Sequence, residues 1–410
     1  MIKIAILGLG SRGALFADYL KEMPDVEIVA VVDVLSSQLE LARKNYNVKE
    51  EMCFRDYRDF YALGKVADGV IIATQDKDHY KHIMPALKLK YHVLLEKPIA
   101  TTPKDCVEIA TEANRNGCRI MVCHVLRYAH FYAYLKNIID SGEIGRVVTV
   151  NQTENVGYWH YAHSFIRCPW KNSDSSSPMI LAKCCHDLDI LSYLIGDDCE
   201  SVSSFGSLTY FRPENAPEGS GEFCYRCTLR DTCIFNGKKI YSDRNWMVLG
   251  SRSQLDVSDM KELDEKLSDE SNPFSRCVFR SDNNVVDHQV VNLLYKNGAT
   301  AHLTMTAFSE ECTRTVKVHG TKGEVEGDME KKKLRLTVFG KGSREIDLTE
   351  LGLDFHCHGG GDRKLIGDFV DMLKGKTDIA ALTTIDKSVE SHMIAFAAEE
   401  SRLTGKTVRL

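Results

Sequence analysis

Short apolar runs alternate with amphipathic stretches along the first third of the chain. Helical patterns lie between the runs, for example at residues 11–23 and 78–89. The apolar runs, rich in Ile, Val and Leu, occupy residues 2–7, 26–32, 69–73, 92–95 and 119–122. A short continuous apolar run is typical of a parallel strand that is buried on both faces. The alternation therefore predicts an α/β fold with a doubly wound parallel sheet and right-handed crossovers.

The pattern changes farther along the chain. Residues 285–319 alternate between apolar and polar side chains, and Asn297-Gly298 among them is a strong hairpin signal. We expect a meander of antiparallel strands in this segment. Residues 384–404 have the pattern of an amphipathic helix that stops at Gly405, and the final TVRL fits a short edge strand.

The first predicted strand leads directly into the motif Gly8-Leu9-Gly10-Ser11-Arg12-Gly13, which opens the first helix. Asp33 stands at the end of the next strand, 20 positions after the last glycine. This context fits the dinucleotide-binding fingerprint, in which the helix N-terminus holds the pyrophosphate. Asp33 would accept hydrogen bonds from a ribose diol and repel a 2′-phosphate, which favours NAD over NADP. The alternative is a plain strand–helix turn that needs glycine.

Two polar segments follow later strands of the predicted sheet, ATQDKDH at 73–79 and Glu96-Lys97-Pro98. Ligands of an open α/β sheet bind outside the carboxyl ends of its strands, so both segments should line the cofactor crevice. The expected cofactor-binding side chains here are Thr74, Gln75, His79, Glu96 and Lys97. Beside a nicotinamide, Lys97 would stabilise a developing alkoxide or carry its proton. Taken alone, Lys97 fits a surface lysine on a loop better.

These motifs together carry a family resemblance. GLGSRG at 8–13, ATQDKDH at 73–79, EKP at 96–98 and IDSGEIGRV at 139–147 resemble the Gfo/Idh/MocA family of NAD(P)-dependent sugar and polyol oxidoreductases. The resemblance covers essentially the whole chain, and EKP is specific for the family but not for a substrate. It implies an N-terminal Rossmann domain over residues 1–122. It also implies an α+β domain over 123–410 with a large, mostly antiparallel open sheet, which in the family often forms homodimers or homotetramers.

The family has a third motif, in which a histidine begins a helix of the second domain and acts with the EKP lysine. The matching stretch is PMILAKCCHDLDIL at 178–191, where His186 takes the histidine position. The family often has an acidic residue four positions earlier, but here that residue is Ala182, followed by Lys183. We predict Lys97 and His186 as the acid–base pair and Lys183 as a third catalytic or substrate-binding group. A histidine with a pKa near neutrality suits alcohol oxidation. A helix-start residue that caps its own turn is the alternative for His186.

Residues 151–171 gather aromatic and basic side chains just before this motif. Ligand pockets combine aromatic surfaces with a few convergent polar groups, so this stretch predicts part of a substrate pocket. Family position adds Arg127 and Tyr128, and His358 precedes three glycines that suggest a close backbone approach. The predicted substrate-binding residues are Arg127, Tyr128, Trp159, His160, His163, Arg167, Trp170, Asp189 and His358. An aromatic loop packed on the sheet and an ordinary helix-entry turn are the alternatives.

Residues 205–280 look like an elaboration of the second domain. Cys224, Cys227 and Cys233 have metal-ligand spacing, and two cysteines in CxxC can chelate one zinc. A structural zinc needs four ligands, so the fourth is a distant His or Cys or is absent. Iron–sulfur or other redox chemistry and free thiols are the alternatives. The sequence distance from Lys97 and His186 favours a structural role.

Composition narrows the remaining classes. The 410 residues carry 52 Lys and Arg against 58 Asp and Glu, a formal charge of −6, which argues against a nucleic-acid partner. No stretch approaches the roughly 18 apolar residues of a membrane span. Fourteen cysteines are too few for a secreted disulfide scaffold, and the N-terminus MIKIAILGLG lacks signal-peptide features. We therefore expect a reducing cytoplasm.

The sequence thus predicts an NAD-dependent oxidoreductase that moves a hydride between nicotinamide and a secondary hydroxyl or ketone. The expected substrate is a sugar, glycoside or cyclitol. A redox-neutral, NAD-dependent glycoside-processing enzyme is one alternative. A non-catalytic NAD-binding regulatory protein is another, and it would have a degenerate reaction centre, whereas Lys97 and His186 are both present.

Overall fold

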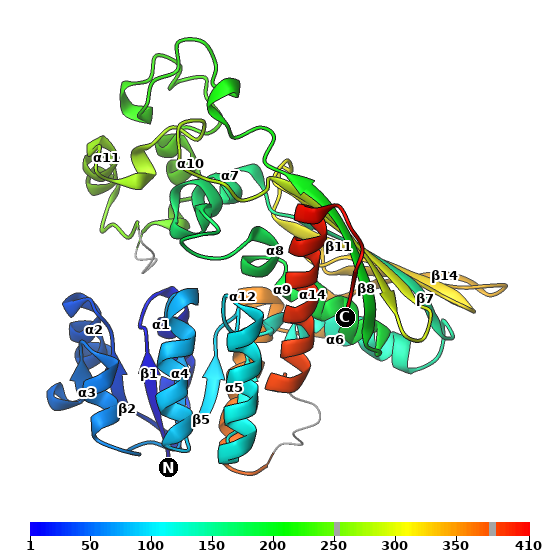
Figure 1. The fold of residues 1–410 in the computed structure, drawn as a ribbon, viewed down its shortest axis with the longest axis horizontal. Coiled ribbons are helices and arrows are strands. Elements are labelled where there is room, and N and C mark those ends of the chain that lie inside the picture. The colour runs from blue at the N-terminus through cyan, green and yellow to red at the C-terminus, as the bar shows by residue number, and fades with distance from the viewer. Residues whose placement is uncertain (250–254, 377–382) are drawn as a thin grey trace.

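A computed structural model describes residues 1–249, 255–376 and 383–410 of the chain. Two sheets lie side by side in the molecule (Figure 1). The first has six parallel strands in the order β3-β2-β1-β4-β5-β6, which confirms the predicted doubly wound sheet. Its strands are β1 (Ile2–Leu7), β2 (Val26–Val32), β3 (Cys53–Phe54), β4 (Gly69–Ile72), β5 (His92–Leu95) and β6 (Ile120–Val122).

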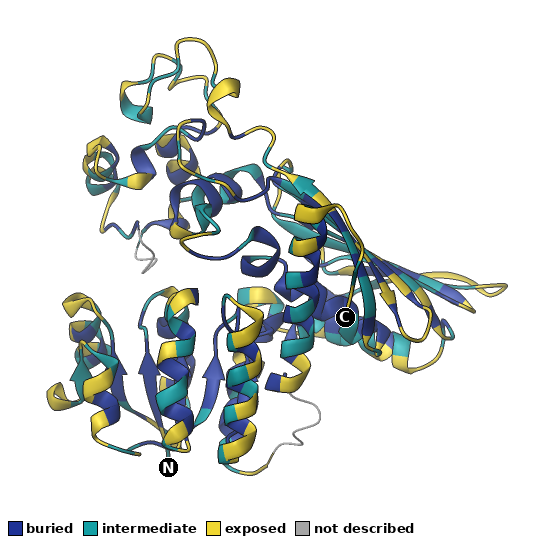
Figure 2. Cartoon of the chain, in the orientation of Figure 1, coloured by how far each residue is buried: buried dark blue, intermediate teal, exposed yellow. Residues whose placement is uncertain are grey.

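Helices cover both faces of this sheet, and their outer surfaces are exposed (Figure 2). They are α1 (Ser11–Lys21), α2 (Ser36–Tyr46), α3 (Tyr57–Ala62), α4 (His79–Lys88) and α5 (Pro103–Asn116). The central strands β1 and β4 read as continuous apolar runs because each side of them packs against a helix layer. Thr102 caps α5 by accepting from the backbone N–H of Asp105, and Gly117 ends that helix with a left-handed conformation.

The second sheet has nine strands in the order β14-β13-β12-β11-β7-β10-β9-β8-β15 and is mostly antiparallel, as expected. Its strands are β7 (Val147–Asn155), β8 (Cys199–Ser207), β9 (His288–Tyr295), β10 (Thr300–Thr306), β11 (Thr313–Gly320), β12 (Gly323–Asp328), β13 (Lys333–Val338), β14 (Gly342–Asp347) and β15 (Val408–Arg409). The terminal strand β15 lies at one edge, as predicted.

The predicted meander over 285–319 is only partly confirmed. Strands β9 and β10 form a hairpin at Asn297-Gly298, where Gly298 has a φ of +81°. Strands β10 and β11 are not neighbours, because β7 lies between them and pairs in parallel with β10. Local alternation predicts strands but not a neighbour that comes from much earlier in the chain.

One face of the nine-stranded sheet is covered by helices. The helix α9 (Cys185–Ile195) packs against β7, and α14 (Ile385–Thr404) packs against β8 and α9. Strand alternation therefore turns Gln152 and Glu154 of β7 toward the helices, where both are buried. The other helices of this half are α6 (His130–Asp140), α7 (Tyr158–Tyr161), α8 (Met179–Ala182), α10 (Gly237–Asp243) and α11 (Met260–Ser268).

A late segment of the chain returns to the first sheet. After α12 (His356–Gly359), the helix α13 (Gly361–Leu373) buries Leu365, Ile366 and Phe369 in the same core as β1 and α1. The Rossmann half is thus completed by residues far from it in sequence. The domain division after residue 122 stays a prediction.

The connection between the neighbouring strands β8 and β9 runs from 208 to 287 and includes α10 and α11. It projects beyond the sheet above the Rossmann half (Figure 1). The elaboration predicted at 205–280 overlaps it, but its residues 250–254 lie outside the described residues. Within the described part of the chain, we find no helix long and apolar enough to cross a membrane.

Candidate active site

The glycines of the first loop leave room for a ligand at one position. Gly8 has a φ of +86°, and a Cβ there would stand 2.5 Å from the carbonyl oxygen of Ala73. A Cβ on Gly13 would stand 1.9 Å from the carbonyl oxygen of Gly8. A Cβ on Gly10, the N-cap residue of α1, would meet no heavy atom of the described residues within 4 Å. The loop is therefore tightly packed around an open helix N-terminus, which fits a pyrophosphate.

Asp33 stands at the end of β2 beside this loop. Its Oδ2 accepts from the backbone N–H of Leu9 at 2.7 Å, and its Oδ1 accepts from the N–H of Leu35 at 2.9 Å. These bonds fix a half-buried carboxylate where the fingerprint places the ribose of a dinucleotide. The residues present thus fit an NAD molecule.

Arg12 ties the glycine loop to the late helix α13, which completes the Rossmann half. Its Nε donates to Glu96 at 2.6 Å, and its Nη2 donates to Asp362 of α13 at 2.7 Å. His358 Nδ1 lies 2.7 Å from the other oxygen of Asp362. Burial alone would raise the pKa of Asp362, but the Arg12 charge and the His358 hydrogen bond lower it overall. Arg12 and Glu96, predicted to bind cofactor, therefore engage each other at the wall of the crevice.

The segment 73–79 contributes mainly to loop geometry. The His79 ring is buried between the carbonyl oxygens of Pro98, at 2.7 Å, and Thr74, at 3.1 Å. Thr74 Oγ1 lies 2.9 Å from Nδ1 of His82. Thr74 and Gln75 face a large cleft, whereas His79 holds together the two loops that carry Thr74 and Lys97.

Lys97 and His186, far apart in sequence, line the same inner cavity of about 280 Å³. Lys97 Nζ donates to the backbone carbonyl of Ala182 at 2.7 Å. In the family motif an acidic side chain often stands at the position of Ala182, so a backbone oxygen holds the ammonium here instead. The structure thus brings the predicted acid–base pair together.

His186 begins α9 with its side chain buried. Burial lowers the pKa of His186 well below its ordinary value, and the Lys97 charge lowers it further. The expectation of a pKa near neutrality is therefore wrong for this state of the protein, and His186 is neutral at pH 7. A neutral imidazole can accept a proton from a hydroxyl, which is the role of a general base.

Lys183 belongs to a buried ionic network beside this pair. Its Nζ lies 3.2 Å from Oε1 of Glu154, whose Oε2 lies 2.8 Å from Nε of Arg314. The same Arg314 nitrogen lies 2.8 Å from Asp187, which also accepts from Gln152 at 2.7 Å. Burial lowers the pKa of Lys183, but the charge of Glu154 outweighs it and raises the pKa overall. Lys183 is therefore a fixed cation at the cavity wall.

The aromatic stretch before this motif reaches the cavity as predicted. An outer cleft of about 1110 Å³ adjoins the inner cavity, and both are lined by His160, Trp170 and His358. Trp159 and His163 line the outer cleft alone. Trp170 Nε1 donates to the buried carboxylate of Asp76 at 3.2 Å, which ties the stretch to the Rossmann half.

The structure does not bring four predicted substrate-binding residues into either space. Arg127 forms a bidentate ion pair with Asp189 of α9, with both contacts at 2.6 Å. The pair anchors α9, and neither side chain lines the inner cavity or the outer cleft. The Tyr128 hydroxyl lies 3.2 Å from Oγ1 of Thr383. Arg167 is buried among backbone carbonyls and donates to that of Phe235 at 2.8 Å. Family position and residue type did not reveal that these side chains already have partners within the protein.

The three predicted metal-binding cysteines line a separate cavity of about 290 Å³ together with Cys277. Arg167 Nη2 lies 3.6 Å from Sγ of Cys224, and the N–H of Gly221 lies 3.3 Å from Sγ of Cys227. Across residues 1–249, 255–376 and 383–410, no group of three or more His, Cys, Asp or Glu side chains is arranged to hold a metal ion. This arrangement therefore does not support the predicted structural zinc on Cys224, Cys227 and Cys233.

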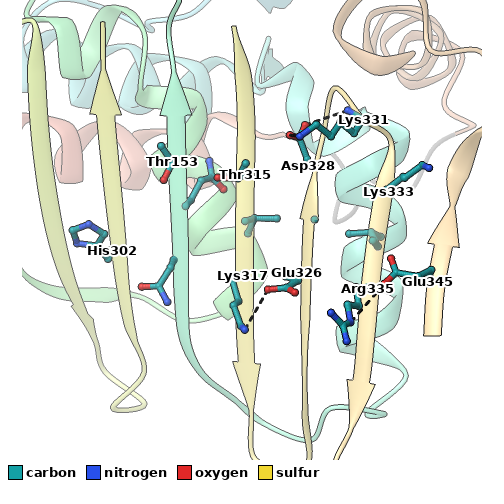
Figure 3. Close-up of a pocket in the computed structure, with 15 residues that line it drawn as sticks. Thr153, His302, Thr315, Lys317, Glu326, Asp328, Lys331, Lys333, Arg335 and Glu345 are labelled. Carbon is teal, nitrogen blue, oxygen red and sulfur yellow. Dashed lines mark hydrogen bonds and ion pairs between the residues drawn. The ribbon is translucent and has the colours of Figure 1, made fainter. Parts of the chain in front are cut away.

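A hollow of about 490 Å³ lies on the uncovered face of the nine-stranded sheet (Figure 3). Its charged side chains pair with one another: Lys317 lies 3.2 Å from Glu326, and Arg335 lies 3.5 Å from Glu345. Thr153 of β7 faces this hollow, so the adjacent residue Glu154 points to the opposite face. The hollow is therefore separate from the space around Lys97 and His186.

Several buried side chains around the inner cavity were not identified from the sequence. Glu154 and Arg314 come from β7 and β11, and only their sheet register brings them together. The one signal in the sequence was a charged residue at a buried position of an alternating strand. His124 is also buried there, with its ring centroid 5.9 Å from that of His186.

Profiles of one oxidoreductase family match almost the entire chain. The profile for its NAD-binding Rossmann fold matches residues 2–124, and the profile for its C-terminal alpha/beta domain matches residues 136–410. Among solved structures, scyllo-inositol dehydrogenase from Lactobacillus casei with bound NAD(H) and scyllo-inositol superposes with a TM-score of 0.67 at 17% identity. The superposition covers 100% of this chain and 99% of that one, so the two share a fold.

Three curated relatives match this chain over different shares of their own length. The oxidoreductase YteT of Bacillus subtilis (strain 168) is 24% identical over 340 residues, covering 80% of this chain and 77% of that protein. Inositol 2-dehydrogenase of Salmonella typhimurium (strain LT2) is 29% identical over 211 residues, 50% of this chain and 57% of that one. The 2,7-anhydro-N-acetylneuraminate hydratase of Escherichia coli (strain K12) is 27% identical over 208 residues, 50% and 53% of the two chains. The match spans little more than half of the latter two proteins.

Proposed function

Because the chain belongs to the Gfo/Idh/MocA family of NAD-binding oxidoreductases, we propose that it interconverts a secondary hydroxyl and a ketone on a sugar, glycoside or cyclitol. The observation that carries this proposal is the meeting of Lys97 and His186 at one cavity, which also reaches Arg12 and Thr74 of the cofactor crevice. The name of the Salmonella relative supports a polyol substrate of this kind.

The residues of the inner cavity have distinct roles in this proposal. Bound NAD supplies the hydride acceptor at its nicotinamide ring. Lys97, held by the carbonyl of Ala182, donates a hydrogen bond to the substrate hydroxyl and stabilises the charge that develops on its oxygen. Neutral His186 accepts the hydroxyl proton as general base. In the reverse direction, protonated His186 returns the proton to the ketone oxygen while Lys97 donates a hydrogen bond to the same oxygen.

Lys183 completes the positioning of the substrate. Its ammonium is fixed by Glu154, which is in turn fixed by Arg314, so the cation has little freedom at the cavity wall. A fixed donor holds a neighbouring hydroxyl of the ring and so orients the reacting carbon. Lys183 therefore binds substrate, whereas Lys97 stabilises the charge on the reacting oxygen and His186 accepts its proton.

We also propose NAD rather than NADP as the cofactor. The Asp33 carboxylate accepts from Leu9 and Leu35 and stays at the ribose position, where it would repel a 2′-phosphate. Asp33→Ser, which removes this charge, tests the preference.

A redox-neutral reaction is the second possibility that an observation favours. The Escherichia coli relative is named a hydratase, and a hydration consumes no net oxidant. Such an enzyme would hold its cofactor through the cycle and release no NADH. The two functions therefore differ in whether NADH accumulates.

The test is a panel of cyclitols, monosaccharides and glycosides incubated with the protein and NAD. We expect NADH to accumulate with at least one class and to stop accumulating in a Lys97→Ala variant that still binds NAD. Substrate consumption without NADH would instead establish the redox-neutral reaction. Absence of any conversion, despite NAD binding, would favour a regulatory protein and contradict the proposal.

We further propose that the protein forms a homodimer or homotetramer in the cytoplasm. The uncovered face of the nine-stranded sheet has a hollow lined by ion pairs such as Lys317–Glu326, and a second copy could cover it by pairing with these charges. All 14 cysteines are free thiols, as a reducing compartment would keep them. Sedimentation of wild type and a Lys317→Glu variant tests the assembly, because a reversed charge on this face should shift the wild-type species toward monomer.

A further inference from the structure

The outer cleft extends well beyond the cavity that holds Lys97 and His186. Resting on the proposed function, we propose that its far end is a subsite for a second, neutral sugar ring. The substrate would then be a glycoside or disaccharide, with one ring at the reaction centre and the other in the outer cleft. Free cyclitols and monosaccharides would fill only the inner part.

The two spaces are continuous but differ in size. The inner cavity measures about 280 Å³ and the outer cleft about 1110 Å³. His160, Trp170 and His358 line both, so a ligand can pass from one to the other. Gly10, Thr74 and their neighbours form the cofactor side of the outer cleft. The opposite wall of the outer cleft lies away from the glycine loop. The roles proposed above for Lys97, His186 and Lys183 do not involve its side chains.

Trp246 gives this far wall an unused aromatic surface. It is 66% exposed, although a large apolar ring is favoured in a protein interior. Trp159 meets it edge-on, with centroids 5.9 Å apart and an interplanar angle of 86°. Trp159 itself is occupied, because His160 stacks on it at 5.6 Å and the Arg244 guanidinium lies 4.7 Å from its ring centroid. Trp246 is therefore the ring that can receive the C–H face of a sugar.

The polar groups around Trp246 suit hydroxyls better than a charged ligand. Arg244 lies 3.9 Å from Glu310, a long ion pair, and Glu311 and Glu330 line the same cleft. One cation against three carboxylates would repel a sugar acid. Carboxylate oxygens and a guanidinium can accept from and donate to the adjacent hydroxyls of a neutral ring. The chemistry of the far wall therefore favours a neutral glycosyl group.

The origin of these side chains supports a role in substrate choice. Arg244 and Trp246 come from the 208–287 connection, which joins two neighbouring strands that a short hairpin would suffice to join. Their contacts with Trp159 place this connection at the outer cleft. An extension that the sheet does not require thus supplies one wall of the cleft.

Matched pairs of probes test the subsite: myo-inositol with galactinol, and D-glucose with maltose and with cellobiose. For each pair, NADH formation gives kcat/KM for the glycoside and for the free ring. We expect a glycoside to exceed its free ring at least tenfold in wild type. In Trp246→Ala this ratio should fall about tenfold, while Phe339→Ala, which removes an exposed ring on the distant β13–β14 turn, should leave it unchanged.

Other results of these measurements would overturn the subsite, the neutral ring or the proposed function. Equal kcat/KM for free rings and glycosides would overturn the subsite and leave the proposed function standing. A Trp246→Ala effect on NAD affinity, measured by calorimetry without sugar, with an unchanged ratio would assign Trp246 to the cofactor instead. A preference for glucuronides over neutral glycosides would overturn the neutral ring. No turnover of any probe would contradict the proposed function itself, and the subsite with it.

Discussion

The inner cavity and the outer cleft meet at His160, yet they are built in opposite ways. Beside the inner cavity, Arg314 of its wall is ion-paired with the buried Glu154 and Asp187, with both contacts at 2.8 Å. In the outer cleft Trp246 is 66% exposed, and the Arg244–Glu310 pair measures 3.9 Å. Buried, paired charges hold one geometry because separating them exposes each to an unfavourable low-dielectric site. Chemistry needs such fixed groups, whereas substrate choice can rest on a wall that is open and adaptable.

The largest loss of activity should come from Lys97→Ala, which removes the ammonium held by the carbonyl of Ala182. Loss of a positioned acid–base group costs about 10²–10⁴-fold in rate. We therefore expect kcat to fall about a thousandfold, with NAD affinity by calorimetry nearly unchanged. Lys104→Ala, at an exposed lysine of α5, is the matched control and should behave as wild type. A fully active Lys97→Ala variant would remove Lys97 from the reaction.

The next largest effect should come from Glu154→Gln in the buried ionic network. This change leaves Lys183 and Arg314 buried with less compensating charge, and removing one partner of a buried pair typically costs 3–5 kcal/mol. We expect the free energy of unfolding in denaturant to fall by about 3 kcal/mol.

An exposed pair supplies the contrast. Lys296 and Asp198 lie 2.7 Å apart, but both side chains are mostly exposed. Asp198→Asn should leave the free energy of unfolding unchanged, because solvent screens such a pair. Equal losses in the two variants would show that burial does not distinguish the inner network from the surface.

A further consequence of burial beside His186 should appear with pH. His124 lies beside His186, and burial lowers its pKa to about 4 from the ordinary 6.5. As pH falls below 6.5 the unfolded chain binds this proton first, so the stabilisation is complete above that pH and is lost toward pH 4. In His124→Phe the free energy of unfolding should therefore change less, by about 2 kcal/mol, between about pH 7 and pH 4.5.

Phe suits this substitution because neither ring nitrogen of His124 has a hydrogen-bond partner among the described residues. An unchanged pH dependence in His124→Phe would mean that His124 is not held neutral in the folded protein.

The smallest effect concerns cofactor choice. Asp33→Ser keeps a hydrogen-bond acceptor near Leu9 but removes the charge that faces the ribose position. We expect the KM for NAD to rise about tenfold, a loss of about 1.4 kcal/mol, and the discrimination against NADP to shrink. Initial rates with the two cofactors measure both, and an unchanged preference would place the ribose elsewhere.

Local signals predicted the Rossmann half, and the family resemblance added Lys97 and His186 as the candidate acid–base pair. The glycine motif, the lysine after β5 and the histidine that begins α9 each stand at an element end, where the chain itself shows their position. The network of Glu154, Arg314 and Asp187 could not be predicted in this way. It joins β7, β11 and α9, and the insertion of β7 between β10 and β11 is a non-local pairing.

The same limit explains the residues whose surroundings were misjudged. Arg127 and Asp189 looked free to bind substrate, yet they satisfy each other across 62 positions of sequence. Cys224 and Cys227 had the spacing of metal ligands, but their sulfurs contact Arg167 and the N–H of Gly221. Spacing shows what a side chain is able to do, whereas its partners, set by the fold, decide what remains available.

The most direct measurement is a crystal structure of the protein with NAD and the substrate that the panel identifies. We expect the reacting hydroxyl oxygen to lie within about 3 Å of both Lys97 Nζ and the His186 ring, with its carbon facing the nicotinamide. A reacting carbon that faces the nicotinamide while its hydroxyl contacts neither side chain would contradict the central claim.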